Sequence, residues 1–217
     1  MPKTVLITGK PCRLASELVR EMLAEGHAVI ATAQATDVSS GEDGLDENLH
    51  YVRWNSRSPL STRSVVMEAV NAYGGLDEAF LVYAPEGIYS PFHETSSATF
   101  EETVDRLVKS YLFMSKEVLS FFQRREGGSM NMVLHDATGE FAGPLDASLR
   151  GSFQSLADSL FVFYQNEPVV LRGFYSESDQ NKEFARYIVS TVRDKSARGG
   201  GKWHRYTARP RLFSFRS

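Results

Sequence analysis

The sequence predicts an α/β protein in which helices cover both faces of a parallel, doubly wound sheet, giving three layers. Two observations lead to this class. Short β-branched and aromatic runs alternate with longer amphipathic stretches along the chain, and glycines stand where several of those stretches should end. The 217 residues contain no repeat and no internal linker, so we expect a single domain, residues 1–217.

The first predicted unit is a strand, a glycine turn and a helix. Val5–Ile7 is typical of a buried parallel strand, Thr8-Gly9 turns the chain, and residues 14–23 have the spacing of an amphipathic helix. Such a unit places the start of its helix at the sheet edge where dinucleotides bind. We therefore expect a Rossmann-like sheet.

The remaining elements alternate in the same way. Polar residues 34–48 and residues 85–95 are expected to be loops, and Thr95 is a candidate cap for the helix after it. The expected strands are 27–32, 49–54, 78–83, 130–134 and 169–174, and the expected helices are 59–73, 98–125, 147–165 and 181–193.

The composition indicates in which cellular compartment we expect the protein. The net charge is −3, with 42% apolar and 24% charged residues, as in ordinary globular proteins. No apolar run is long enough to cross a membrane, and the N-terminus leads directly into a strand without a signal peptide. The single cysteine, Cys12, fits a reducing compartment. We expect a cytoplasmic protein with no membrane contact.

The C-terminal end, residues 193–217, is strongly basic. It holds eight Lys or Arg residues and one acid, Asp194, with aromatic residues between them. This pattern can mark a nucleic-acid surface, but aromatic residues also build strands. We favour a seventh strand and a tail that packs on the acidic body or on a neighbouring subunit, and we do not expect a nucleic-acid partner.

Four stretches, in this order, resemble the short-chain dehydrogenase/reductase family over about residues 3–195. Thr8-Gly9 matches the start of the family's Thr-Gly-x-x-x-Gly-x-Gly loop, and residues 75–84 are similar to its fourth strand and the turn after it. Residues 100–119 resemble its long fourth helix, and residues 127–134 its fifth strand. The resemblance implies an NAD(P)-binding fold and a homodimer or homotetramer built through the helices at 98–125 and 147–165.

The family's catalysis needs a Tyr that exchanges the substrate proton and a Lys that lowers the pKa of that Tyr and holds the ribose. It also needs a Ser that positions the carbonyl and an Asn that holds a relay water. By the resemblance these four positions carry, in turn, Asp146, Arg150, Leu134 or His135, and Leu107. All four roles are therefore expected to be unfilled. An Asp is ionised at neutral pH and is a poor proton donor, and Arg150 can pair with it one helical turn away.

Two alternatives keep a reaction in the same region. His135, Asp136, Asp146 and Arg150 can form a new acid–base cluster at the carboxyl ends of the strands. Otherwise His135 or Tyr83 donates the proton, and Arg150 holds the ribose or the substrate. No His or Cys pattern has metal-ligand spacing, so no metal is expected.

The cofactor loop is altered as well. Arg13 and Ala15 stand at the family's second and third glycines, Pro11 removes a backbone donor, and Tyr83-Ala84-Pro85 replaces Asn-Ala-Gly beside the cofactor. Cations at the helix N-terminus can still hold an anion. NAD or NADP is therefore a possible cofactor, without a preference. The candidate cofactor-binding residues are Gly9, Lys10, Arg13, Leu14, Gln34, Asn55 and Ala84.

The substrate lid that the family places after its sixth strand is reduced here to a few residues, about 175–180. We therefore expect a dehydrogenase-like protein that has lost the family's catalysis and acts as a nucleotide- or anion-binding protein or a dimeric scaffold. The alternative is an active NAD(P)-dependent oxidoreductase with an atypical site.

Overall fold

The computed structural model describes residues 2–9, 12–33, 46–84, 87, 91–137, 143–194 and 200–208. The described residues form a seven-stranded sheet in the order β3-β2-β1-β4-β5-β6-β7, and every neighbouring pair is parallel. The strands are β1 (Thr4–Ile7), β2 (Ala28–Ala33), β3 (Leu49–Arg53), β4 (Glu78–Tyr83), β5 (Gly128–His135), β6 (Val169–Ser176) and β7 (Trp203–Tyr206). The predicted doubly wound α/β class is confirmed.

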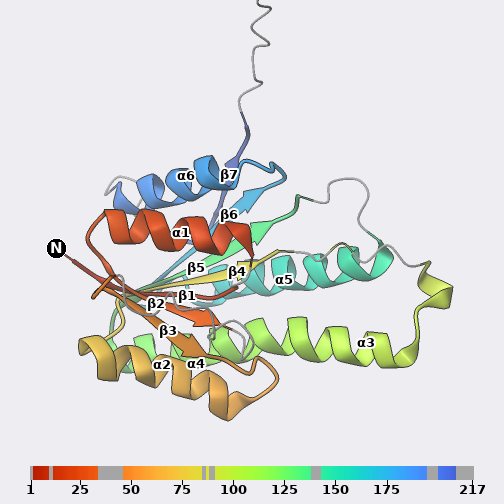
Figure 1. Ribbon diagram of the computed structural model, residues 1–217, viewed down its shortest axis with the longest axis horizontal. Helices are drawn as coiled ribbons and strands as arrows, with labels where there is room; N and C mark the ends of the chain where they lie inside the picture. The colour runs from red at the N-terminus through yellow and green to blue at the C-terminus, as the bar shows by residue number, and fades with distance from the viewer. Residues whose placement is uncertain are drawn as a thin grey trace, which may run out of the picture.

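Helices cover both faces of the sheet (Figure 1). Helices α1 (Arg13–Ala24) and α6 (Asn181–Arg193) lie on one face, and α2 (Pro59–Tyr73), α4 (Lys109–Arg125) and α5 (Pro144–Phe163) lie on the other. None of the described helices is long and apolar enough to cross a membrane.

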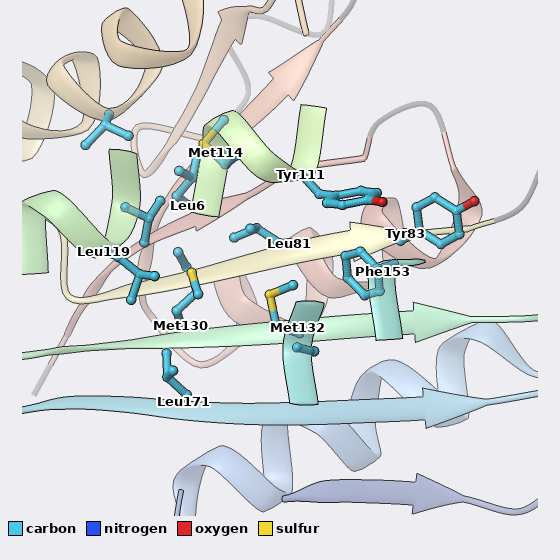
Figure 2. Packing of buried hydrophobic residues seen from close by; sticks show 14 of the residues in the cluster. Leu6, Leu81, Tyr83, Tyr111, Met114, Leu119, Met130, Met132, Phe153 and Leu171 are labelled. Carbon is cyan, nitrogen blue, oxygen red and sulfur yellow. The ribbon is translucent and has the colours of Figure 1, made fainter. Parts of the chain in front are cut away.

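Each face of the sheet has its own apolar core, because successive strand residues point to opposite faces. Leu6, Leu81 and Met132 face α4 and α5, whereas Val5 and Val133 face α1 and α6. Figure 2 shows the first of these cores, in which side chains from β1, β4, β5 and β6 meet those of α4 and α5. The two cores hold the strand ends in fixed positions, and the candidate site is built at those ends.

Several predicted elements have the observed bounds, and others need correction. The helix at 59–73, the strand at 78–83 and the helix at 181–193 are confirmed to the residue. Strand β5 is longer than the predicted 130–134, and α5 begins at Pro144 rather than near residue 147, because proline fits the first turn of a helix. Most of the predicted loop at 34–48 lies outside the described residues.

The helix predicted at 98–125 is three segments in sequence. Helix α3 (Ser97–Thr103) passes into a π-helical segment, η2 (Val104–Val108), and then into α4. Figure 1 shows α3 continuing beyond the edge of the sheet. Ser96, not Thr95, caps this helix, because its hydroxyl accepts the Thr99 N–H at 3.1 Å. Thr95 instead lies after a short 3-10 turn, η1 (Phe92–Glu94).

The basic end does supply a seventh strand. β7 joins the edge of the sheet beside β6, and its Trp203 packs edge-on against Phe161 of α5, with ring centres 5.7 Å apart. Residues 209–217 lie outside the described part of the chain, so the expected packing of the tail stays a prediction.

The turn after β1 joins two strands at the centre of the sheet. The Thr8 hydroxyl accepts the Val82 N–H of β4 at 3.1 Å, and the Thr8 N–H donates to the Phe80 carbonyl at 2.9 Å. Gly9 has φ +97°, and a Cβ there would lie 3.0 Å from the Val82 Cβ and carbonyl oxygen. Both the backbone conformation and the close approach therefore require glycine.

We predict that Gly9→Ala lowers the free energy of unfolding by about 2 kcal/mol, since it adds a displacement of Val82 to the cost of positive φ. The matched control is Gly26→Ala, at φ +77° with no neighbour within 4 Å, which should cost about 1 kcal/mol. Urea unfolding of both variants measures the difference. Equal losses would mean that the contact with Val82 contributes nothing.

Candidate functional site

The candidate site lies at the carboxyl edge of the sheet, where β1 and β4 are neighbours and the strand order reverses. In open α/β sheets this is the position where ligands bind. Helix α1 begins here directly after the Gly9 turn, with Cys12 as its N-cap residue. The Cys12 Sγ accepts the Ala15 N–H at 3.4 Å, and burial raises the pKa of this thiol. Cys12 therefore stabilises the helix start as a neutral group.

Four predicted cofactor residues take different places around α1. Leu14 is fully buried under the helix, and Ala84 is half-buried directly after β4. Arg13 is exposed and lines a groove between α1 and α6. Asn55 is exposed beyond β3, where its side-chain oxygen accepts the Arg57 N–H at 3.1 Å. Gly9 and Ala84 thus flank the β1–β4 edge, whereas Arg13 lies on its α6 side.

Several predicted positions cannot be placed. Lys10 and Gln34, together with Pro11 and Pro85 of the altered motifs, lie outside the described residues. Their expected contacts with a cofactor stay predictions.

Tyr83 belongs to the core and not to the open edge. Its ring is 4% exposed, stacks on Phe153 with ring centres 5.1 Å apart, and meets the edge of Tyr111 at 6.1 Å. Figure 2 shows these three rings together at the carboxyl end of β4. The cavity beside them measures only about 30 Å³, far below the size of a small-molecule site. The phenol therefore leaves the turn after β4, contrary to the expectation that it lies along the cofactor.

Asp146 is buried at the third position of α5, with no exposed surface. A carboxylate in the first turn of a helix is stabilised by the free N–H groups and the dipole there. The N-cap residue, Gly143, has no side chain to satisfy those groups. Asp146 is thus suited to support the start of α5, a role that a tyrosine at this position cannot fill.

Arg150 forms its ion pair with Asp136 and not with Asp146 as predicted. Its Nη1 meets Oδ2 of Asp136, the residue directly after β5. The Asp136 side chain is 1% exposed and that of Arg150 33% exposed, and the hydrogen bond with Asp136 raises the pKa of the guanidinium. The spacing of Asp146 and Arg150 along α5 predicted a pair within the helix. In the fold, the end of β5 places the Asp136 carboxylate against the Arg150 guanidinium instead.

His135 lies on the opposite face of the sheet from Asp136. Its Nε2 is 2.8 Å from the Ser178 carbonyl oxygen, and its ring packs against Phe184 of α6. Adjacent strand residues point to opposite faces, so the predicted cluster of His135, Asp136, Asp146 and Arg150 is divided. The structure brings Asp136 and Arg150 together and directs His135 toward α6.

Two further positions that the resemblance assigns, Leu107 and Leu134, hold apolar core side chains, and His135 stays the alternative to Leu134 for the family's Ser. Leu134 is 1% exposed within the core that faces α4 and α5, and Leu107 packs against the same core from the π-helical segment. Neither side chain can donate or accept a proton.

A polar cluster that the sequence did not predict lies at the ends of β6 and β7. The Tyr175 hydroxyl donates to Glu177, and Arg205 lies 3.3 Å from the same carboxylate and 5.2 Å from the Tyr175 ring centre. Burial and the bond with Glu177 raise the pKa of Tyr175 to about 12. Its members come from the end of β6 and from β7, which lie far apart in the sequence, so no local pattern could reveal the contact with Arg205.

The connection between β6 and α6 is only residues 177–180, as expected for a missing lid. The carbonyl oxygen of Ser178 meets His135, and the Tyr206 hydroxyl donates to Gln180 at 3.2 Å. In the described part of the chain no group of three or more His, Cys, Asp or Glu side chains is placed to hold a metal ion.

The parallel sheet, the glycine turn between β1 and α1 and the helix start at the strand-order reversal define an α/β protein of the dinucleotide-binding class. A family model described as short chain dehydrogenase matches residues 3–135, more than half of the sequence. The chain belongs to this family, and the predicted resemblance is confirmed.

Solved structures with the same fold are similar over nearly their whole length. A putative 3-oxoacyl-reductase from Bacillus thuringiensis has a TM-score of 0.77 at 15% identity, covering 95% of this chain and 97% of the other. A structure of ElxO with NADP bound has a TM-score of 0.79 at 15% identity, covering 94% and 97%.

A short-chain dehydrogenase from Bacillus anthracis strain Ames Ancestor gives a TM-score of 0.79 at 13% identity, covering 94% of each chain. No curated protein matches the sequence. At these identities the structural likeness establishes the fold, and the chemistry depends on the residues of this chain.

We predict that Arg150→Gln lowers the free energy of unfolding by about 2 kcal/mol, because it leaves the Asp136 carboxylate buried without its cation. A buried ion pair usually costs more to break, but the guanidinium is partly solvated. The control is Arg193→Gln, whose pair with Glu25 is largely exposed and should contribute about 0.5 kcal/mol. Chemical denaturation that gives both variants the same loss would contradict a structural role for Arg150.

Proposed function

We propose that this protein binds a nicotinamide dinucleotide at the carboxyl edge of its sheet without performing the proton relay of its family. The observation that carries the proposal is the state of the two α5 positions. Asp146, at the position that the resemblance assigns to the family's Tyr, is buried at the helix start, and Arg150, at the position assigned to its Lys, is paired with Asp136. A bound dinucleotide would then act as a signal or a structural ligand.

The residues at the edge fit such a ligand. The close approach at Gly9 keeps the turn low over β4, and the first turn of α1 starts beside it. Tyr83 is packed into the core, and Arg13 lines a groove on the α6 side. Neither side chain therefore occupies the space over β1 and β4 that a dinucleotide would need. Gly9, the N-terminus of α1 and Ala84 would hold the dinucleotide, which can supply a hydride when bound. The structural neighbour with bound NADP supports the same assignment.

The alternative, an oxidoreductase with an atypical site, requires a proton donor that reaches substrate. The candidates were Tyr83 and His135, which are 4% and 6% exposed, and the His135 ring is engaged with Ser178. The pKa of Tyr175 is raised to about 12, and its hydroxyl donates a hydrogen bond to Glu177. These burials and bonds favour binding over turnover.

Calorimetric titration of the full chain with NADH and with NADPH tests the proposal. We expect at least one to bind with a micromolar dissociation constant, and we expect no oxidation of either when simple carbonyl substrates are added. Absence of binding would overturn the dinucleotide assignment. Substrate-dependent oxidation at 340 nm would instead support the atypical enzyme.

A matched pair of variants places the binding site. Ala84→Glu puts a carboxylate at the proposed edge and should abolish binding, because it repels the pyrophosphate and occupies its path. Ala72→Glu makes the same change on the exposed surface of α2 and should leave the affinity unchanged.

We further propose that the protein is a homodimer, or a homotetramer, that packs through the helices at 98–125 and 147–165. Large apolar side chains are exposed on these helices. Val104 and Leu112 are 39% and 43% exposed, and Val162 and Phe163 at the end of α5 are 69% and 79% exposed. A two-fold axis would bury these side chains against their copies.

Leu112→Arg should shift the protein from dimer to monomer in sedimentation or light-scattering measurements, because it places a charge in the proposed apolar contact. Leu60→Arg is the control, since Leu60 is 77% exposed on α2 and belongs to neither of these helices. A monomeric wild-type protein, or a dimer unaffected by Leu112→Arg, would contradict the proposed interface.

A further inference from the structure

A cavity of about 450 Å³ lies between the starts of α1 and α6, on the α6 side of the dinucleotide edge. Its size is in the range of small-molecule sites. Residues of both helices and of the short β6–α6 connection line it. This cavity is not explained by the proposed dinucleotide site, which lies over β1 and β4.

The wall on the α6 side is held in place by hydrogen bonds. The Ser178 N–H donates to the Ser176 hydroxyl at 3.0 Å, the Gln180 N–H donates to the Ser178 hydroxyl at 3.1 Å, and Tyr206 of β7 fixes the Gln180 side chain. On the sheet side His135 meets the Ser178 carbonyl oxygen. The cavity is therefore preformed and does not need a loop to close over it.

Two cations in the wall have no carboxylate partner among the described residues. Arg13 comes from the first turn of α1, and Lys182 comes from the first turn of α6. A third cation, Arg20, is neutralised by Glu17 at 2.7 Å. Helix α6 has no side-chain cap, so its first N–H groups also favour an anion. The wall thus offers two free cations to one anionic group.

The same wall carries hydrogen-bond acceptors. The Asn181 Oδ1 is buried and has no hydrogen-bond partner, while its Nδ2 donates to the Asp179 carbonyl oxygen at 3.1 Å. The carboxylates of Asp179 and Glu183 also line the cavity. The Asn181 oxygen has almost no exposed surface, so the two carboxylates are the acceptors that a ligand in the cavity can reach.

We propose that this cavity binds a sugar phosphate. The phosphate lies against Arg13, Lys182 and the start of α6, and the sugar hydroxyls donate to Asp179 and Glu183. An anion without hydroxyl groups would leave the acceptors of the wall unpaired, and an uncharged sugar would leave its cations unpaired. The site is separate from the dinucleotide edge and does not depend on whether that edge is occupied.

Ribose 5-phosphate is the probe, with ribose and inorganic phosphate as its two fragments. Calorimetry of the full chain should show saturable binding of ribose 5-phosphate and much weaker binding of either fragment. Arg13→Gln and Lys182→Gln should each weaken the binding about tenfold, since each removes one charged hydrogen-bond donor. Arg186→Gln on the same helix is the control, because Arg186 pairs with Glu21 outside the cavity, and it should leave the affinity unchanged.

The following results would overturn the site: no binding of ribose 5-phosphate to the wild-type protein, or affinities unaffected by both cavity variants. Equal affinity for inorganic phosphate would reduce the site to an adventitious ion only. Ala84→Glu separates the two proposals, because it should retain ribose 5-phosphate binding even though it blocks the dinucleotide edge. Displacement of ribose 5-phosphate by NADPH, or its loss in Ala84→Glu, would place the probe at that edge and refute a separate site.

Discussion

The arrangement of the carboxyl edge depends on the contact between the turn after β1 and strand β4. Thr8 bonds to the backbone of Phe80 and Val82, and the missing side chain of Gly9 lets the turn lie directly on Val82. This contact fixes the start of α1, and α1 in turn supports α6 on the same face. A ligand site at this edge therefore rests on the hydrogen bonds between Thr8 and β4 and on one glycine.

The family's scaffold is retained around a carboxyl edge where two charged side chains of α5 are buried or paired. A buried Asp146 supports the start of α5, and Arg150 compensates the buried carboxylate of Asp136. Both side chains hold elements together, since Asp146 lies in the first turn of α5 and the Arg150 ion pair joins α5 to the end of β5. A carboxylate buried beside a guanidinium is costly to disturb, so the pair of Asp136 and Arg150 opposes rearrangement at this edge.

Much of the fold was predictable because it depends on local patterns. Apolar periodicity and helix-ending glycines gave the helix at 59–73 and the strand at 78–83 to the residue. The site was less predictable because it depends on which face each side chain takes. His135 and Asp136 are adjacent in sequence but contact α6 and α5, and the pairing of Arg150 required the end of β5 to be placed against α5. The family resemblance predicted which sequence positions belong to the site, but it did not predict in which direction their side chains point.

The π-helical segment has a consequence for the surface of the long helix. A turn closed five residues back, as between the Lys109 N–H and the Val104 carbonyl, contains one residue more than an α-helical turn. Each residue of an α-helix advances the direction of its side chain by about 100°. The buried face of α4 therefore does not continue in line along α3. Because of the extra residue, each α3 side chain points about 100° away from the direction that uninterrupted α-helical spacing would give it. If two copies met along α4, their α3 segments would be rotated away from that contact.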